Sequence, residues 1–361
     1  MRLTRFALLC IASLTLAVTG CNPASTDNGG DGTSNGGNTS TENGGEQNTS
    51  LSGQINIEGS STVEPISNRA KEMFNETYPN VNVAVSGQGT GNGFKALAKK
   101  ECDLSDASRP IKKKEFDSCK SASINFYEIP VAYDGLTVVV NNKNDFVKSL
   151  SVDQLKKIFR EDMAAKTWKE VDPSWPDEKI SIYSPGIASG THDYFVEVIG
   201  KKDKKGHRSD EQTTLSEDDK LLVTGVKGDQ YAIGFFGYSY FDANRNELQA
   251  VPIVNPKNDK PVSPSMDTIE SGEYAPFSRP LFIYVNTESY QRAEVKEFVD
   301  FYLDNITDIV KKAGYVPLPQ AVYDAGKSHI AKDMPGTHYL DGDDKREGGV
   351  TEVYKADNLV E

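Results

Sequence analysis

The chain has few of the residues that bind metals: its 361 residues include only 4 Cys and 4 His. The cysteines form no CxxC or CxxH spacing, and the histidines (His192, His207, His329 and His338) are scattered along the sequence. A protein metal site needs several such ligands at short, regular spacings. We therefore expect no metal site, and nothing else in the sequence indicates a cofactor.

Positive charge is also scarce, with 40 Lys and Arg against 53 Asp and Glu and a formal net charge of −13. Proteins that bind nucleic acid usually carry a basic domain or stripe. Here the longest uninterrupted basic run is Lys112–Lys114, so we do not expect nucleic acid as a partner. An acidic chain can still bind a small anion, because backbone N–H groups and one or two guanidinium groups suffice locally.

Outside the N-terminus, no stretch approaches the roughly 18 consecutive apolar residues of a transmembrane helix. Residues 1–20 have a basic start at Arg2 and Arg5, followed by a short apolar run, as in a secretory signal. The sequence Val18-Thr19-Gly20-Cys21 resembles a bacterial lipobox. We expect residues 1–20 to be a lipoprotein signal peptide and Cys21 to carry the lipid. The chain would then be anchored to a membrane and face the periplasm or the cell exterior; the alternative is a plain signal peptide with a chance Cys.

Two cysteines, Cys102 and Cys119, remain if Cys10 is removed with the signal and Cys21 is lipidated. In an oxidising compartment two such thiols usually pair. We therefore expect a disulfide between Cys102 and Cys119.

Composition changes at both ends of the chain. Residues 21–50 are almost wholly small or polar and read as a lipidated, flexible linker. Residues 331–361 are polar and charged, and we expect them to be a poorly packed C-terminal extension. Between these ends, 37% hydrophobic residues with 16 Tyr and 15 Phe can supply a substantial core.

Apolar runs in this central part alternate with amphipathic stretches, which indicates an α/β fold. We expect strands at 55–57, 81–85, 136–140, 180–183 and 281–285, and helices at 65–78, 94–100, 151–159, 192–199 and 293–303.

Three expected helices begin next to small and hydroxyl-bearing residues. These starts are Gly59-Ser60-Ser61-Thr62-Val63, Gly87–Gly93 with Thr90, and Ser189-Gly190-Thr191. A helix N-terminus has unpaired N–H groups and a partial positive charge, so it can bind an anion, although each start could be an ordinary N-cap. None carries the Gly-Lys-Ser/Thr of a Walker motif, which leaves nucleotide binding a weak alternative.

Charged residues next to these starts suit the same ligand. Arg109, after Asp106-Ala107-Ser108, offers a forked donor that fits two oxygens of a tetrahedral anion. A buried carboxylate would accept a hydrogen bond from protonated phosphate and repel sulfate. For this role we choose Asp106 first and Asp134 second; the alternative is that Asp106 only caps its loop or pairs with Arg109.

These segments together resemble the phosphate-binding lipoproteins of bacterial phosphate ABC transporters. The order is the lipobox, then GSSTVEPI, SGQGTGNGF, CDLSDASRPI, PVAYDGLTVVVN, SPGIASGTHDYF and SRPLFIYVN. The resemblance covers about 54–325 and implies a two-domain α/β fold of the type II periplasmic binding proteins, with a ligand cleft between the domains and two crossover strands. It implies domain I at 51–134 and 278–330, and domain II at 135–277.

The resemblance also implies ligand contacts, an ABC permease as partner and no enzymatic activity; we expect a monomer. One branch of the family has an arginine where this chain has Pro185, so we expect Arg109 to be the charge partner. The implied phosphate contacts are Ser61, Thr62, Val63, Thr90, Ser108, Arg109, Ser189, Gly190 and Thr191.

Other functions stay open. Another oxyanion, such as sulfate, molybdate or an organic phosphate, could be the ligand. A secreted hydrolase could use Ser189 with His192, but no G-x-S-x-G elbow surrounds Ser189. A surface adhesin would need exposed binding features that a sequence does not reveal.

Overall fold

The computed structural model describes residues 50–187, 189–200, 205–216, 218–346 and 348–361, which lie in one compact unit, Gly45–Glu361. Its helices are α1 (Glu64–Thr77), α2 (Thr90–Ala98), α3 (Lys113–Ser121), α4 (Val152–Phe159), α5 (Trp168–Val171), α6 (Gly190–Gly200), α7 (Asp219–Gly228), α8 (Tyr238–Asn244), α9 (Met266–Glu270), α10 (Ala293–Asp304), α11 (Ile306–Lys312), α12 (Gln320–Ala331) and α13 (Val350–Val353). Its strands are β1 (Gly53–Gly59), β2 (Val81–Ser86), β3 (Leu104–Ala107), β4 (Phe126–Asn141), β5 (Ser181–Pro185), β6 (Thr213–Ser216), β7 (Ala232–Gly237), β8 (Leu248–Ala250), β9 (Ile253–Asn255), β10 (Lys260–Val262), β11 (Ser278–Asn286), β12 (Val316–Pro317), β13 (Leu340–Asp341) and β14 (Asp344–Lys345).

Ten of these strands form one mixed sheet in the order β2-β1-β3-β11-β4-β7-β5-β6, with β8 and β12 also paired to β4. The first half of the sheet consists of β2, β1, β3, β11 and the part of β4 that pairs with β11. The second half consists of the rest of β4 with β7, β5, β6 and β8. Within each half the strands joined through helices are parallel: β1 with β2 and β3, and β5 with β6 and β7. The structure therefore confirms the predicted α/β fold with two domains.

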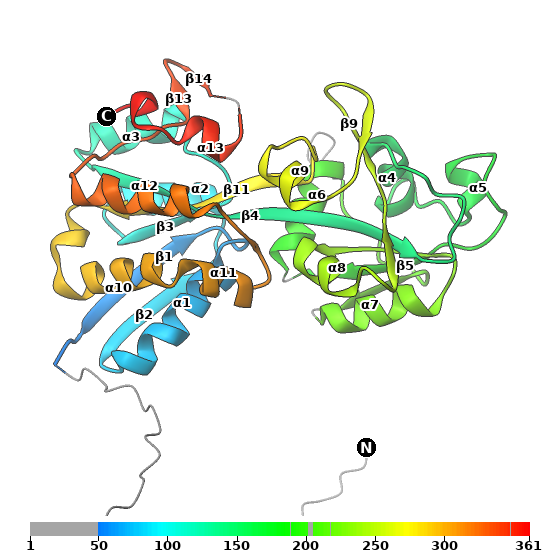
Figure 1. Cartoon of the computed structure of the whole chain (residues 1–361), viewed down its shortest axis with the longest axis horizontal. Helices are drawn as coiled ribbons and strands as arrows, with labels where there is room; N and C mark the ends of the chain where they lie inside the picture. Colours follow the sequence, from blue (N-terminus) through cyan, green and yellow to red (C-terminus); the bar gives the residue numbers. More distant parts are fainter. Residues whose placement is uncertain (1–49, 188, 201–204, 217, 347) are drawn as a thin grey trace, which may run out of the picture. The chain divides into compact units, whose positions relative to one another are not determined.

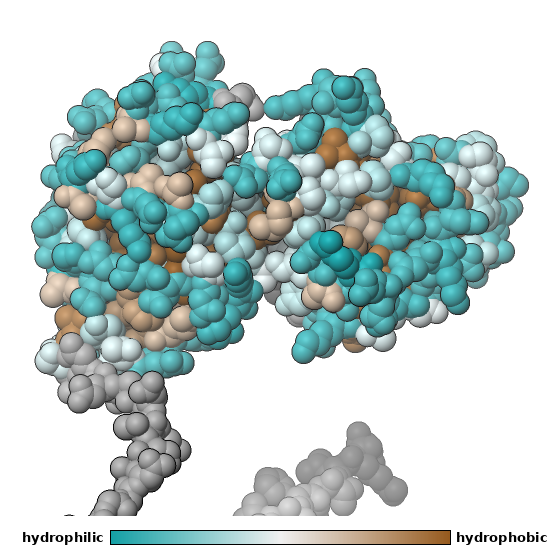
Figure 2. Space-filling view, in the orientation of Figure 1, coloured by the Kyte–Doolittle hydropathy of each residue, from teal (hydrophilic) through white to brown (hydrophobic). Residues whose placement is uncertain are grey.

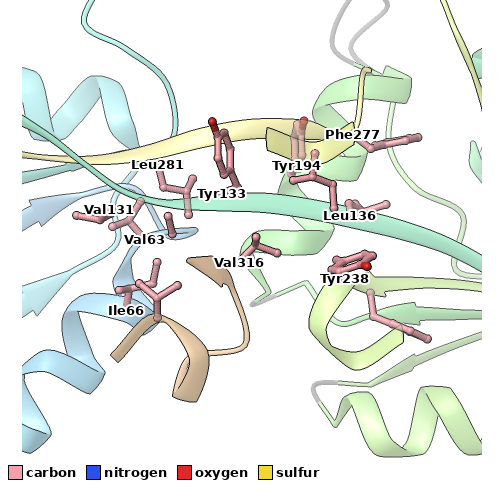
Figure 3. Close-up of a cluster of buried hydrophobic side chains, with 14 of the residues drawn as sticks. Val63, Ile66, Val131, Tyr133, Leu136, Tyr194, Tyr238, Phe277, Leu281 and Val316 are labelled. Atoms are coloured by element: carbon pink, nitrogen blue, oxygen red, sulfur yellow. The ribbon is translucent and has the colours of Figure 1, made fainter. Parts of the chain in front are cut away.

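Strands β4 and β11 connect the two halves. β4 is buried along its whole length; Phe126–Gly135 pairs with β11, and Leu136–Val140 pairs with β7. Figure 1 shows β4 running from one group of helices to the other, with β11 alongside it. The hydrophobic core follows the same path, because Val131, Tyr133 and Leu136 of β4 belong to one cluster of buried side chains (Figure 3).

Parallel βαβ units bring the three predicted helix starts to the carboxyl ends of strands. α1 follows β1, α2 follows β2 and α6 follows β5. The carboxyl edge of an open parallel sheet is where α/β proteins place their ligands. α2 begins at Thr90, earlier than the predicted 94, so the glycine-rich segment forms its first turn.

The C-terminal residues correct the prediction of a poorly packed extension. Tyr339, Leu340, Val350, Val353 and Tyr354 are each at most 4% exposed, and several of them pack with residues of α2, α3 and β11. The sequence of this segment looks polar because its buried residues are few and widely spaced. Their contacts lie on distant parts of the chain, which no local pattern reveals.

The predicted disulfide is also corrected. Cys102 and Cys119 are both free thiols, buried in the same hydrophobic cluster as Phe94 and Phe116. Burial raises the pKa of Cys119 to about 11, and that of Cys102 still further, so both thiols are protonated at neutral pH.

The predicted signal peptide and Cys21 lie outside the described residues, as does nearly all of the linker. Within the described residues no helix combines the length and the apolar character needed to cross a bilayer. On the face shown in Figure 2, hydrophilic residues predominate and apolar ones form small patches.

Candidate functional site

The first loop, Ser60–Thr62, lies between β1 and α1 and is held from below by β3, because Ser60 N donates to Asp106 O at 2.9 Å. Ser60, Ser61 and Thr62 line a cavity of about 770 Å³. Val63 does not line it: this side chain is fully buried in the core (Figure 3), and its backbone N–H already donates to Ser60 O.

The second loop leads from β2 into α2 at Thr90, and the third follows β3 at Ser108. These two loops meet at a pair of hydroxyl groups. Thr90 Oγ1 lies 3.1 Å from Ser108 Oγ and accepts a hydrogen bond from Ser108 N at 3.1 Å. Gly89, Thr90, Gly91, Ser108 and Arg109 line the same cavity as the first loop. The sequence prediction that these loops share a site is therefore consistent with where the structure places them.

Arg109 lies at the cavity but is bound to an acid close to it in the sequence. Its guanidinium donates to Glu115 Oε2 at 2.8 Å and to Glu115 Oε1 at 2.7 Å, and the two side chains are 29% and 20% exposed. Burial pushes the pKa of Glu115 upward, but hydrogen bonds from Arg109 and from the Lys112 backbone outweigh it and hold this pKa below its usual value. Arg109 must therefore break or share its hydrogen bonds to Glu115 in order to contact an anion.

A second arginine, Arg279, was not identified from the sequence as a site residue. It is the second residue of β11 and donates to Thr62 Oγ1 at 3.0 Å and to Asp134 Oδ2 at 3.1 Å. Its guanidinium carbon lies 3.6 Å from the centre of the Tyr194 ring on α6. Arg279 thus joins the first loop, a crossover strand and α6, and it lines the same cavity as Arg109.

Asp134, the second choice for a selectivity carboxylate, is 1% exposed beside Arg279. Burial raises the pKa of Asp134, while the charge and hydrogen bonds of Arg279 oppose that rise. Asp134 lines a smaller cavity of about 190 Å³, together with Ser189, Gly190 and Thr191. Arg279 contacts Asp134 on one side and Thr62 on the other, so the two cavities are linked through this ion pair.

The start of α6 touches the first loop. A Cβ on Gly190 would lie 2.5 Å from Thr62 Cα, so only glycine permits this approach. Ser61 Oγ also donates to Asp193 Oδ2 at 3.2 Å. The structure therefore brings the predicted residues of both halves together, although Ser189–Thr191 face the smaller cavity.

Asp106, the first choice for selectivity, lines neither of these cavities. It is 1% exposed beneath α1, where its Oδ1 accepts a hydrogen bond from Ser67 Oγ at 3.0 Å. Burial raises the pKa of Asp106 to about 8, with the Ser67 hydrogen bond acting in the opposite direction. Asp106 does not pair with Arg109 either, since that guanidinium is taken by Glu115.

The hydrolase alternative finds no support in the geometry. Ser189 Oγ accepts a hydrogen bond from Thr191 N at 3.2 Å. His192 is buried with its ring centre 5.5 Å from that of His207, and its Nδ1 has no hydrogen-bond partner among the described residues. A nucleophile needs a base within hydrogen-bonding reach, and no hydrogen bond among the described residues joins Ser189 to His192.

The charge of the larger cavity suits an anion. Its basic residues are Arg109, Lys112, Lys257, Arg279 and Lys345, and its acidic residues are Asp193, Glu197 and Glu270. The cavity is thus locally cationic in a chain whose net charge is −13. Concave, cationic sites with hydroxyl and N–H donors bind oxyanions.

A model of the PBP superfamily domain matches residues 44–305. The chain is 42% identical over 307 residues to Protein SphX of Synechococcus elongatus, an alignment that covers 84% of this chain and 89% of the relative. It is 41% identical over 268 residues to the phosphate-binding protein PstS of Staphylococcus haemolyticus, covering 74% of this chain and 81% of the relative.

Solved structures agree with these sequence matches. A "possible phosphate binding protein" from Planctomyces limnophilus has a TM-score of 0.75 and 43% identity, covering 79% of this chain and 99% of that one. An ABC-type phosphate transport receptor from Vibrio cholerae has a TM-score of 0.54 and 25% identity, covering 73% of this chain and 100% of that one.

Proposed function

This chain belongs to the PBP superfamily, and we propose that it binds inorganic phosphate outside the cytoplasm and delivers it to the permease of an ABC transporter. The observation that carries the proposal is the convergence of three hydroxyl-bearing loops, the start of α6 and two arginines on linked cavities. Relatives named as phosphate-binding proteins, at 41% and 39% identity, support phosphate as the anion.

Phosphate would contact both halves of the sheet. Ser61, Thr62, Thr90 and Ser108 would donate from the first half, and Ser189–Thr191 from the start of α6. Val63 could contribute only backbone atoms, because its side chain is buried. Helix N-termini stabilise an anion through their free N–H groups and dipoles, so these donors act in the same direction as the arginines.

Arg279 would be in position before the ligand binds, and Arg109 would move to the ligand on binding. Each would contribute one positive charge to the site. Arg279 already donates to Thr62, the residue at the centre of the first loop. Arg109 would exchange part of its pairing with Glu115 for phosphate oxygens. A planar guanidinium suits this role because it can bind two oxygens at once.

Asp134 would discriminate between phosphate and sulfate. It is buried, and it lines the smaller cavity with Ser189–Thr191. A carboxylate there can accept a hydrogen bond from protonated phosphate, but it faces sulfate as one anion faces another. Asp106 would play no direct part, because Ser67 and the underside of α1 surround it.

The two domains, 51–134 with 278–330 and 135–277, would close on the ligand about β4 and β11. A ligand held by both domains favours the closed form only through contacts that it makes there. Residues 331–361 follow domain I in the chain. We further propose that Cys21 is lipidated after removal of residues 1–20, that residues 21–50 are the linker to the membrane, and that the protein is a monomer without enzymatic activity.

Calorimetry tests the ligand. Protein freed of bound anion should take up one phosphate per chain, and sulfate, molybdate and a phosphomonoester should compete poorly. Tight binding of one of these, with no binding of phosphate, would overturn the choice of ligand. If neither phosphate nor any of the other oxyanions releases heat on titration, the proposed function is overturned.

Membrane fractionation tests the anchor. Cys21→Ser should release the protein from the membrane, whereas Cys10→Ser, within the signal peptide, should leave it bound. Equal release of both variants, or of neither, would contradict lipidation at Cys21.

A further inference from the structure

The C-terminal segment, described at Thr337–Arg346 and Gly348–Val360, is fastened to the first half by a buried acid on β4. Glu128 is 2% exposed, and its carboxylate accepts hydrogen bonds from Thr337 Oγ1 at 2.5 Å and from His338 N at 2.8 Å. Tyr354 OH donates to the backbone oxygen of Glu128 at 2.7 Å. Two ends of the segment thus converge on one residue of a crossover strand.

A second set of contacts adds apolar packing to this anchor. Tyr339 stacks edge-on against Phe282 of β11 with 5.2 Å between ring centres, and Leu340 and Val353 lie in the same buried cluster. A buried, hydrogen-bonded and packed segment keeps a defined position. The C-terminal segment is therefore a rigid part of the first half.

From this anchor the segment extends to the ligand cavity. Lys345, Gly348, Gly349 and Val350 line the cavity of about 770 Å³, and Val350 N donates to Tyr133 OH at 3.2 Å. Lys345 is exposed at the end of β14, so its ammonium group is free to face an entering anion. The segment thus contributes both backbone and positive charge to the cavity wall.

Across the cavity mouth, the segment meets α9, which follows the hairpin β9–β10 and precedes β11. A Cβ on Gly349 would lie 3.1 Å from Glu270 O and 3.8 Å from Ser271 Cα. Glu270, Ser271 and Gly272 line the same cavity. Figure 1 shows α13 and α9 on the same side of β4, at facing ends of the two groups of helices.

We infer that the C-terminal segment is a strap that holds α9 against the first half and slows release of the bound anion. This inference rests on the proposed function, and it assigns a role in binding to residues that follow the last predicted domain. Ligand leaves such a cleft only when the two domains separate. A contact made only in the closed form stabilises that form, and Lys345 raises the local concentration of anions.

An engineered disulfide tests the strap. The variant Gly349→Cys with Ser271→Cys should join the segment to α9, since the Cβ of residue 349 would lie within 4 Å of Ser271 Cα. The native thiols Cys102 and Cys119 are buried and should not interfere. Phosphate release, measured by stopped-flow with a phosphate trap, should be about tenfold or more slower in the oxidised than in the reduced protein, because opening then requires the bond to break.

Each single cysteine variant is the matched control and should show no redox dependence. Equal release rates in the oxidised and reduced double variant, with the disulfide verified by mass spectrometry, would overturn the strap. Failure of the unmodified protein to bind phosphate would instead overturn the proposed function. The two failures are therefore distinguishable.

A charge reversal tests the role of Lys345. Lys345→Glu should slow phosphate association about threefold or more at low salt, with the difference shrinking as salt rises. Lys355→Glu makes the same change of charge on the same segment, at an exposed residue that does not line the cavity, and should have a smaller effect. Equal effects of the two variants would remove Lys345 from the site.

Discussion

The two arginines at the cavity are held in opposite ways. Arg109 pairs with Glu115, six positions away in the sequence, and both side chains remain partly exposed. Arg279 pairs with Asp134 and donates to Thr62, which lie far from it in the sequence, and its side chain is 14% exposed. A local, partly exposed pair can exchange its partner for a ligand, whereas a buried long-range pair also holds the fold together.

Removing Arg279 should have the largest effect. Arg279→Ala leaves Asp134 buried without its partner, and breaking such a pair usually costs about 3–5 kcal/mol of stability. Phosphate binding should also weaken about 30-fold or more, by analogy with truncated buried charge pairs. Thermal unfolding and calorimetry measure the two effects.

The double variant Arg279→Ala with Asp134→Ala is the control, since it removes both charges. It should regain stability relative to Arg279→Ala but should not regain phosphate affinity. Wild-type affinity in either variant would contradict a direct role for Arg279.

Replacing Asp134 should change selectivity. Asp134→Asn removes the charge that would repel sulfate, so we expect sulfate affinity to rise about tenfold or more while phosphate affinity falls. Asp106→Asn serves as the matched control at a carboxylate that is equally buried but outside the cavities. Competition binding with the two anions measures both; a gain of sulfate binding in Asp106→Asn alone would reverse the assignment.

Removing Arg109 should have a smaller effect on binding and little on folding. Arg109→Ala should weaken phosphate binding about tenfold, which corresponds to about 1.4 kcal/mol. The partly exposed pair with Glu115 should contribute only about 0–1 kcal/mol to stability. Calorimetry and chemical denaturation of the same samples separate the two terms.

The Glu115→Gln variant tests whether Glu115 competes with phosphate for Arg109. It weakens the hold on Arg109, so phosphate affinity should stay equal or rise slightly. A loss of affinity as large as that of Arg109→Ala would mean that Glu115 positions the arginine for the ligand.

Asp106 should have the smallest effect on phosphate binding, because it lines neither cavity, but it should change the pH dependence of stability. Burial raises the pKa of Asp106 from 3.8 to about 8. A carboxyl group with a raised folded-state pKa stabilises the fold fully below its unfolded value and loses that contribution as the pH rises toward the folded value. Wild-type stability should therefore fall between about pH 4 and pH 8.

Asp106→Asn removes this titration and keeps an oxygen that can accept from Ser67. The variant should gain stability relative to the wild type on going from pH 5 to pH 8, as measured by thermal unfolding. A constant difference between the two proteins at both pH values would show that Asp106 does not titrate in this range.

Local patterns in the sequence predicted five of the described strands and five of the described helices, including the three helix starts that lie at the cavities. The spacing of apolar residues in 65–78 predicted a helix, and α1 occupies Glu64–Thr77. The hydroxyls of Thr90 and Ser108 were predicted to share a site, and they lie 3.1 Å apart. Such features are predictable because neighbouring residues specify turns, caps and helix ends, and parallel strands bring those ends to one edge.

Long-range contacts were decided by the tertiary structure alone. Arg279 lies within the segment SRPLFIYVN, and nothing near it in the sequence reveals that β11 delivers it to Thr62. The C-terminal segment was expected to be poorly packed, since its anchor, Glu128, lies on a strand about two hundred residues earlier. Asp106 and Asp134 looked alike as carboxylates near turns, yet only Asp134 faces a cavity, and the direction of a side chain from a sheet depends on strand pairing.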